Sequence, residues 1–198
     1  MRAMGEPFAS ASFEDHTFEG IEAPGADLSN KEFTRCTFRH CKLQESSWAS
    51  SQLEECAFED CDLTNLHPKG IKLRGVEFTR SKLLGVDWAM AVAHPVVGFT
   101  DCNMRYQLFV TTKLKNTRFV RCSLVECTFV DADLAKTTFT ECDLAQSVFE
   151  RCDLSGADFC TSRAVYFDPT KNKIKGARIS VQTASLIAQA MGLRVIED

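Results

Sequence analysis

The sequence predicts an all-β chain folded as a four-sided β-helix of about eight coils, followed by a C-terminal α-helix. Two observations support this prediction. The stretch from Thr117 to Thr161 divides into nine units of five residues, each with Phe or Leu at its centre and a small residue two positions earlier. A period of five fits neither an α-helix nor a flat strand. If each unit forms one side of a square, residues twenty apart stack along the axis.

The second observation is that such columns exist along most of the chain. Stacked coils pair at about 4.8 Å, so similar side chains pile up in the core. The Phe column contains one step of 21 residues, which predicts a single slip of register. The four columns are Phe18, Phe38, Phe58, Phe78, Phe99, Phe119, Phe139 and Phe159; Ala23, Leu43, Leu63, Leu83, Met104, Leu124, Leu144 and Ala164; Leu28, Trp48, Pro68, Trp88, Phe109, Phe129 and Phe149; and Phe13, Phe33, Leu53, Leu73, a break near His94, Leu114, Leu134 and Leu154.

These columns divide the chain into three parts. Residues 1–10 are predicted to be a lead-in or cap, residues 11–164 the β-helix, and residues 165–198 a C-terminal cap and dimerisation helix. Ser180 is a predicted N-cap and Gly192 a predicted helix stop. Between them an apolar helical face is predicted from Val181, Ala184, Ile187, Ala188 and Met191.

Two irregularities interrupt the repeat. Pro68 stands where Phe or Leu is due, and because proline has no N–H for a neighbouring coil it predicts a local bulge. The segment between Trp88 and Phe99 spends eleven residues where ten are due, which predicts a bulged coil with Pro95 at its turn. Pro68, His94 and Pro95 are therefore candidate bulge contacts for a partner. The alternative is a tolerated corner insertion.

Composition and charge restrict the class of function. Hydrophobic residues make up 44% and charged residues 25%, with a net charge of −4. No signal peptide or long apolar run is found, which predicts a cytoplasmic protein without membrane association. The net negative charge argues against direct nucleic-acid binding. Six aspartates precede core residues and are predicted to form a partner-binding surface, or simply a solvated acidic surface: Asp62, Asp87, Asp133, Asp143, Asp153 and Asp158.

The ten cysteines are predicted to be structural. Nine occupy the small inward position, at spacings of five or multiples of five, and only Cys160 does not. Buried free cysteine behaves as a small hydrophobe. No metal, cofactor or catalytic constellation is predicted, and the chain is not expected to be an enzyme. A thiol sensor is the weaker alternative.

Several outward positions in the C-terminal half are apolar. Leu108, Val110, Val130 and Val148 are predicted to share one side of the square, and Val125 lies on another. A contiguous strip suggests a contact surface, although β-propensity alone also favours valine.

From about Phe8 to Ala164 the repeat resembles the pentapeptide-repeat family, whose motif is A(D/N)LXX. The resemblance implies a right-handed quadrilateral β-helix. The segment ASLIAQAMGLRVI, residues 184–196, is similar to the C-terminal segment of Qnr-type and MfpA-type members, which protect DNA gyrase and topoisomerase IV from poisons. It implies a homodimer joined through that end by Leu186, Ile187, Met191, Leu193 and Val195.

The same resemblance implies a non-enzymatic, DNA-mimicking rod that binds a type II topoisomerase and confers quinolone- or albicidin-type antibiotic resistance. This chain lacks the two projecting loops of Qnr proteins from Gram-negative bacteria. In that respect it looks more like the loop-poor members, including those that resist albicidin. The rival hypothesis is a general protein-interaction scaffold with a different partner.

Overall fold

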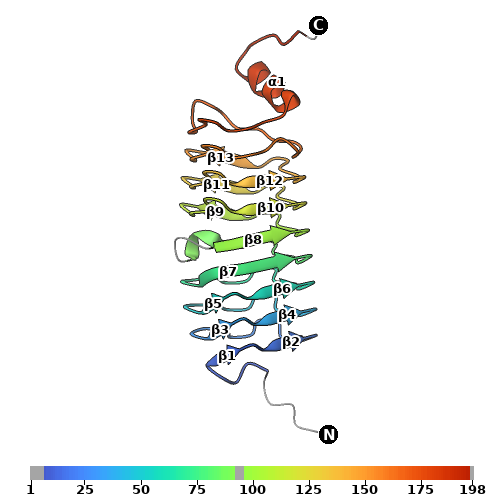
Figure 1. Ribbon diagram of the computed structural model, residues 1–198, viewed down its shortest axis with the longest axis vertical. Coiled ribbons are helices and arrows are strands. Elements are labelled where there is room, and N and C mark those ends of the chain that lie inside the picture. The colour runs from blue at the N-terminus through green and yellow to red at the C-terminus, as the bar shows by residue number, and fades with distance from the viewer. Residues whose placement is uncertain (1–6, 92–95, 197–198) are drawn as a thin grey trace.

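A computed structural model describes residues 7–91 and 96–196. They form a β-solenoid of about seven turns, with the first and last described residues at opposite ends of the rod and one helix near the C-terminal end (Figure 1). The β-helix predicted from the period of five is confirmed. Within the described residues, no helix is long and apolar enough to cross a membrane.

Short parallel strands run along the sides of this solenoid. β1, β3, β5 and β7 pair in order on one face, β2, β4, β6 and β7 on the next, and β9, β11 and β13 form a separate sheet. β7 turns a corner and so belongs to two faces (Figure 1). The elements are β1 (Ser12–Glu14), β2 (Thr17–Glu19), β3 (Glu32–Thr34), β4 (Thr37–Arg39), β5 (Gln52–Glu54), β6 (Ala57–Glu59), β7 (Lys72–Thr79), a 3-10 turn (Trp88–Met90), β8 (Val96–Thr100), β9 (Leu108–Val110), β10 (Arg118–Val120), β11 (Thr128–Val130), β12 (Thr138–Thr140), β13 (Val148–Glu150) and α1 (Val181–Ala190).

The Phe column forms the centre of the core as predicted. Phe18 pairs in register with Phe38, and the pairing continues up the rod across the slip, where Phe78 pairs with Phe99. The eight rings from Phe18 to Phe159 stack nearly parallel, with centroids 4.5 to 5.2 Å apart. Neighbouring columns meet edge to face, as Phe129 and Phe139 do at 87°. Both geometries are favourable for aromatic rings.

Each corner is made by the residue two positions after a core centre. These residues adopt a left-handed backbone, for example Arg35 with φ +51° and His40 with φ +51°. For a residue other than glycine this costs roughly 1–2 kcal/mol. The corner N–H donates to the next coil, as from Arg35 to the carbonyl of Glu54 at 2.8 Å. The fold therefore accepts a repeated local strain that hydrogen bonding and core packing offset.

The slip of register arises at the 3-10 turn above Pro68. In the coil below, Trp48 N–H donates to His67, but Pro68 has no N–H to give to Asp87. The carbonyl of Asp87 instead accepts from Met90 N–H at 3.4 Å. Gly70 N–H then bonds twenty residues ahead, to Met90, whereas Ser50 N–H bonds nineteen ahead, to Lys69. The extra residue therefore enters before Met90.

Two sequence predictions, the bulge at Pro68 and the core position of Ala164, are wrong. Pro68 is buried and in register, as its column predicted, but without a bulge: its ring fills the core, and the carbonyl of Asp87 that lacks a donor accepts from the 3-10 turn instead. Ala164 is exposed with φ +54°, because the chain leaves its column and Val165 and Phe167 fill the end of the core instead. His94 and Pro95 lie outside the described residues.

The C-terminal helix has the predicted ends but a different inward face. Ser180 Oγ accepts from Thr183 N–H at 3.1 Å, and Gly192, with φ +84°, is followed by Leu193 N–H bonding to Ala188 at 3.0 Å. This is a Schellman-type ending. Thr183 and Ile187 face the coil, whereas the predicted members Val181, Ala184 and Met191 are exposed. Only a narrow stripe of α1 therefore contacts the solenoid.

Candidate partner-binding surfaces

Each of the six predicted aspartates accepts a hydrogen bond from the backbone of its own turn. The Oδ1 of each accepts the backbone N–H of the residue two positions later, at 3.0 to 3.2 Å. For the six residues the donors are Thr64, Ala89, Ala135, Ala145, Ser155 and Cys160. Hydrogen bonds from Ser155 lower the pKa of Asp153, and the N–H of Cys160 lowers the pKa of Asp158. The predicted surface residues therefore stabilise the coil itself.

Four of these six carboxylates are also paired with a cation one coil later. The pairs are Asp62–Lys82 at 3.8 Å, Asp143–Arg163 at 2.7 Å, Asp153–Lys173 at 3.8 Å and Asp158–Arg178 at 2.9 Å. The aspartate side chains are only 20 to 32% exposed. Much of their charge is thus balanced locally and is less available to a partner than the sequence suggested.

The structure does not bring the six aspartates together. Asp62 and Asp143 share one column of bridges, and Asp133 and Asp153 pair directly in a second. Asp158 stacks with Thr138 on a third side, and Asp87 with Leu108 on the fourth. The six aspartates are therefore distributed over all four sides of the solenoid, because their common position in the unit recurs on each side.

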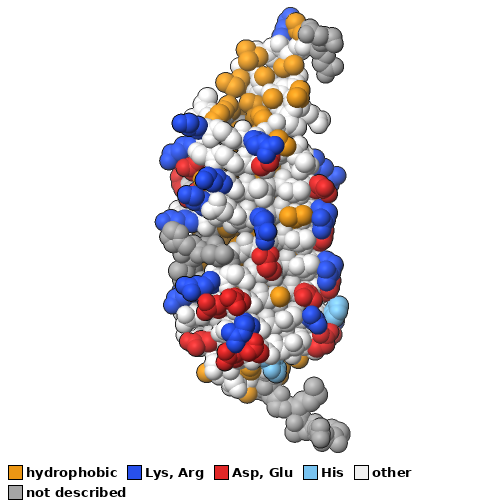
Figure 2. Space-filling view, viewed as in Figure 1, with side chains coloured by type: hydrophobic (Ala, Val, Ile, Leu, Met, Phe, Trp, Pro, Cys, Tyr) orange, Lys and Arg blue, Asp and Glu red, His pale blue; other side chains and the backbone are white. Residues whose placement is uncertain are grey.

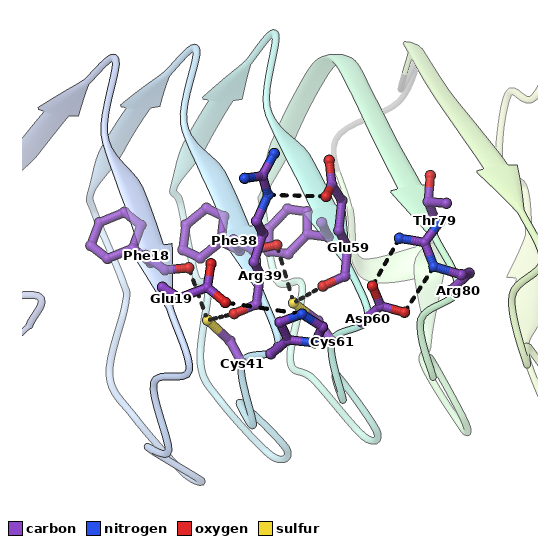
Figure 3. A network of polar contacts seen from close by, with 12 residues as sticks. Phe18, Glu19, Phe38, Arg39, Cys41, Glu59, Asp60, Cys61, Thr79 and Arg80 are labelled. Carbon is purple, nitrogen blue, oxygen red and sulfur yellow. Dashed lines mark hydrogen bonds and ion pairs between the residues drawn. The ribbon is translucent and has the colours of Figure 1, made fainter.

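A second set of carboxylates, at the corners, was not singled out from the sequence. Each accepts two hydrogen bonds from an arginine twenty residues later. In the pair Asp60–Arg80, Nε donates to Oδ1 at 2.9 Å and Nη2 donates to Oδ2 at 2.8 Å (Figure 3). The others are Asp15–Arg35, Asp101–Arg121 and Asp131–Arg151. Asp followed by Arg at a spacing of twenty is the signal that could have found them.

We expect these corner pairs to make stability fall at acid pH. Hydrogen bonds from arginine lower the pKa of Asp60, Asp101 and Asp131 below the usual 3.8. The contribution of the pairs is therefore present above about pH 4 and is lost as pH falls through the folded-state pKa. The melting temperature of Asp131→Asn should lie below that of the native chain at pH 7, and the difference should vanish near pH 2. A difference that persists at pH 2 would contradict this role.

Charge is distributed unevenly along the rod. Residues 7–91 contain fourteen acidic and nine basic side chains, a net charge of −5, whereas residues 161–196 contain one acidic and six basic, a net charge of +5. Figure 2 shows acidic side chains gathered toward the N-terminal end, basic ones along the C-terminal coils, and apolar ones on the helical end. The net charge of −4 for the whole chain therefore averages over an acidic N-terminal part and a basic C-terminal part.

The cysteines are packed as predicted. All nine at the small position are buried, and Cys160 is half-buried. Each buried thiol donates to a carbonyl of the coil below, as Cys41 does to Phe18 and Cys61 to Phe38, both at 3.4 Å (Figure 3). Burial raises the pKa of Cys56 to about 11 and that of Cys127 to about 12. Among the residues that the structure describes, no group of three or more His, Cys, Asp or Glu could hold a metal ion.

This packing predicts that the native thiols are unreactive. Only the thiolate is nucleophilic. The pKa is raised for most of the buried thiols, and although hydrogen bonds with other thiols lower the pKa of Cys41 and Cys102, both side chains are buried away from an alkylating reagent. Iodoacetamide at pH 7.5 should label at most Cys160 in the folded protein and all ten cysteines in guanidinium chloride, as counted by intact mass. Rapid labelling of several thiols in the folded protein would revive the thiol-sensor alternative.

Two apolar surfaces are exposed. The strip of Leu108, Val110, Val130 and Val148 lies on β9, β11 and β13 as predicted, with Leu108 41% and Val148 48% exposed. The second is the C-terminal surface around and beyond α1. Of the five predicted dimer residues, Leu186, Met191, Leu193 and Val195 are exposed, whereas Ile187 is buried against the coil. Val181 and Ile196, at 88% and 83% exposed, extend this surface.

A shallow depression of about 720 Å³ lies beside the irregular coil. Its lining includes Glu45, Asn65, His67, Pro68 and Asp87. Pro68 thus reaches the floor of this depression although its ring is buried.

The sequence match decides the family. Residues 31–97 and 71–159 match the profile of the pentapeptide repeat region, and together they span more than half of the chain. The chain belongs to the pentapeptide-repeat family. No curated protein sequence matches this pentapeptide-repeat protein significantly.

Solved pentapeptide-repeat structures share its fold. HetL, a pentapeptide repeat protein involved in heterocyst differentiation regulation from the cyanobacterium Nostoc sp. strain PCC 7120, is 15% identical, with 86% of each chain covered and a TM-score of 0.71. A trypsin-treated form of QnrB1, a plasmid-mediated fluoroquinolone resistance protein, is 18% identical, with 95% of this chain and 100% of that chain covered and a TM-score of 0.65. At these identities the likeness establishes the fold, and it confirms the resemblance to Qnr-type proteins at that level.

Proposed function

We propose that this pentapeptide-repeat protein is a non-enzymatic, dimeric rod that binds a type II topoisomerase, DNA gyrase or topoisomerase IV, in place of DNA. It would thereby relieve poisoning by quinolone- or albicidin-type antibiotics in the cytoplasm. The observation that carries the proposal is a rigid rod with an acidic N-terminal half and an exposed apolar surface at its C-terminal end. The fold shared with a fluoroquinolone resistance protein supports it.

The dimensions and charge of the rod agree with this role. Seven turns at about 4.8 Å give a solenoid of roughly 34 Å, and joining two copies end to end doubles that length. In such a dimer the apolar C-terminal surfaces bury one another, and the two acidic halves point outward. DNA has one charge per about 1.7 Å, so the rod is less densely charged than DNA. Mimicry therefore depends on shape and on the acidic outer halves rather than on overall density.

Within the acidic halves, unpaired carboxylates are the best contacts for a basic DNA-binding surface. Glu45 and Glu55 are exposed corner residues, and neither makes an ion pair with any other residue that the structure describes. Charge reversal of these two should weaken binding without removing a turn acceptor. The six aspartates predicted from the sequence are less suitable test positions because they hold the coil together.

Supercoiling by purified gyrase, titrated with this protein in the presence of ciprofloxacin or albicidin, tests the proposal. We expect restored supercoiling at low protein concentration with one drug class, and inhibition of gyrase at higher concentration. The Glu45→Lys/Glu55→Lys variant should require a higher concentration for both effects. Absence of any effect on gyrase and topoisomerase IV at micromolar dimer would refute the proposal.

The second candidate is a scaffold for a different protein partner. The specific observation that favours it is the strip on β9, β11 and β13, whose apolar side chains lie on a side of the solenoid and not on the helical end. Capture on immobilised native protein, compared with the Leu108→Glu/Val148→Glu variant, distinguishes the candidates. A partner lost only from that variant, without any effect on gyrase, would favour the scaffold.

A further inference from the structure

A lysine patch lies on one face of the C-terminal coils. It consists of Lys113, Lys115, Lys136, Lys171, Lys173 and Lys175, all of them exposed. Figure 2 shows basic side chains gathered along the C-terminal coils on one side of the rod. In the coils that carry Lys113, Lys115, Lys173 and Lys175, the only acidic residues described on their side are Asp133 and Asp153, which lie between Lys113 and Lys173 in one column. Together with Lys136 at the corner beside it, this side has five lysines and two aspartates, a local charge of +3. Lys171, at the opposite corner, has Glu150 and Asp168 beside it.

The solenoid fixes the spacing of these lysines. Bridges from Lys113 through Asp133 and Asp153 to Lys173 place the two lysines three coils apart, or roughly 14 Å at about 4.8 Å per coil. Lys115 and Lys175 occupy a parallel column two residues along the strand, roughly 7 Å away. Four lysines therefore stand at the corners of a flat rectangle, with Lys136 at a coil corner beside it.

The positive charge of the patch exceeds the negative charge within it, although Asp153 is close enough to Lys173 and Lys115 for both to contribute, after the hydrogen bonds from Ser155, to the lowering of its pKa. Among the described residues, Lys115, Lys136, Lys171 and Lys175 have no carboxylate within ion-pair distance, and Lys173 lies 3.8 Å from Asp153. Asp133 and Asp153 each commit Oδ1 to a backbone N–H, of Ala135 and Ser155 respectively. The Debye length is about 8 Å at physiological salt, so the acidic coils near the N-terminus are largely screened from this patch.

The residue types of the patch indicate which class of partner it could bind. Protein–protein interfaces are depleted in lysine and depend on aromatic anchors. In these coils, the side of the square that carries Lys113, Lys115, Lys173 and Lys175 has no aromatic residue, and Ile174 is its one exposed large apolar residue among those described. The exposed Tyr166 of the same coils lies off this side, beyond the corner at Lys171. Single-stranded nucleic acid also requires aromatic stacking platforms. Lysine contacts to phosphates need neither of these features.

We propose that the lysine patch binds the phosphate backbone of duplex DNA without reading its sequence. The net negative charge of the chain predicted no direct contact with nucleic acid, but that prediction averages over two oppositely charged halves. The inference does not depend on the proposed topoisomerase function. If two copies join at their C-terminal ends, their two patches lie in the middle of the rod and both are available to one duplex.

Fluorescence anisotropy with a labelled 24-base-pair duplex tests the inference. Binding should be weak and should fall steeply between 50 and 200 mM salt. With about four phosphate contacts the slope of log K against log salt should be near −3.6. The Lys115→Glu/Lys175→Glu variant should bind at least tenfold more weakly at 50 mM salt while keeping the native melting temperature.

The matched control is Lys69→Glu/Lys72→Glu. These two exposed lysines belong to the N-terminal half, so the variant has the same net charge as the patch variant. It should bind DNA within about twofold of the native chain. Equal weakening by both variants, or no binding at 50 mM salt, would overturn the inference. Equally strong competition by poly-glutamate at matched charge would instead assign the patch to an acidic protein and overturn the assignment to DNA.

Discussion

Phe119→Ala should destabilise the rod by about 3–5 kcal/mol, the range for removing a buried phenylalanine from a packed core. Phe119 is completely buried and stacks between Phe99 at 5.1 Å and Phe139 at 5.0 Å. Its loss opens a cavity in the middle of the column, and the solenoid cannot collapse around it because each coil is held in register by its neighbours. Guanidinium denaturation followed by circular dichroism gives the free energy of unfolding.

The control for this experiment is Thr111→Ala, an exposed corner residue close to the same level of the rod. It should change stability by less than about 1 kcal/mol, as surface substitutions do. Because solenoid stability is a sum over repeats and their interfaces, Phe119→Ala should also broaden the transition as the two halves uncouple. A loss below 1 kcal/mol for Phe119→Ala would contradict the account of the core.

Leu193→Glu should convert the proposed dimer to a monomer. Leu193 is 62% exposed and lies in the C-terminal surface with Leu186 and Met191. A carboxylate buried there without a partner opposes association strongly. Light scattering after size-exclusion chromatography should give about twice 22.1 kDa for the native chain and 22.1 kDa for the variant.

Leu108→Glu is the matched control, because it places the same charge in the other exposed apolar surface. It should leave the dimer intact. If Leu108→Glu dissociates the dimer and Leu193→Glu does not, the two copies join through the β9–β11–β13 face instead. A native chain that is monomeric at 100 micromolar would refute the dimer altogether.

The period of five was sufficient to predict the columns. If each unit of five residues forms one side of a square, four units complete a turn, and core residues twenty apart stack on one another. The period also kept Pro68 in register, but it could not predict the absence of a bulge there, since that depends on the 3-10 turn at Trp88–Met90, where the carbonyl of Asp87 accepts from Met90 N–H. The end of the repeat at Ala164 was predicted, but the exposure of Ala164 itself was not. The next residues that fill the core, Val165 and Phe167, no longer follow the repeat.

The candidate surfaces were harder to predict than the fold. Asp153 was recognised as outward-facing, but its bonds to Ser155 and Lys173 depend on the turn geometry and on the coil above. The exposed positions of Leu186 and Leu193 were predicted through a family resemblance, not through periodicity. The lysine patch escaped notice because Lys115 and Lys175 are sixty residues apart, and only the stacking of coils brings them onto one face.

Competition between this protein and DNA for gyrase is the most direct test of the central claim. Fluorescently labelled dimer is bound to gyrase, and unlabelled duplex long enough to fill the DNA-binding surface is added. Mimicry predicts that the duplex displaces the protein, and that Glu45→Lys/Glu55→Lys lowers the affinity of the protein for gyrase. Stable binding of protein and DNA to the same enzyme, with no mutual loss of affinity, would contradict binding in place of DNA.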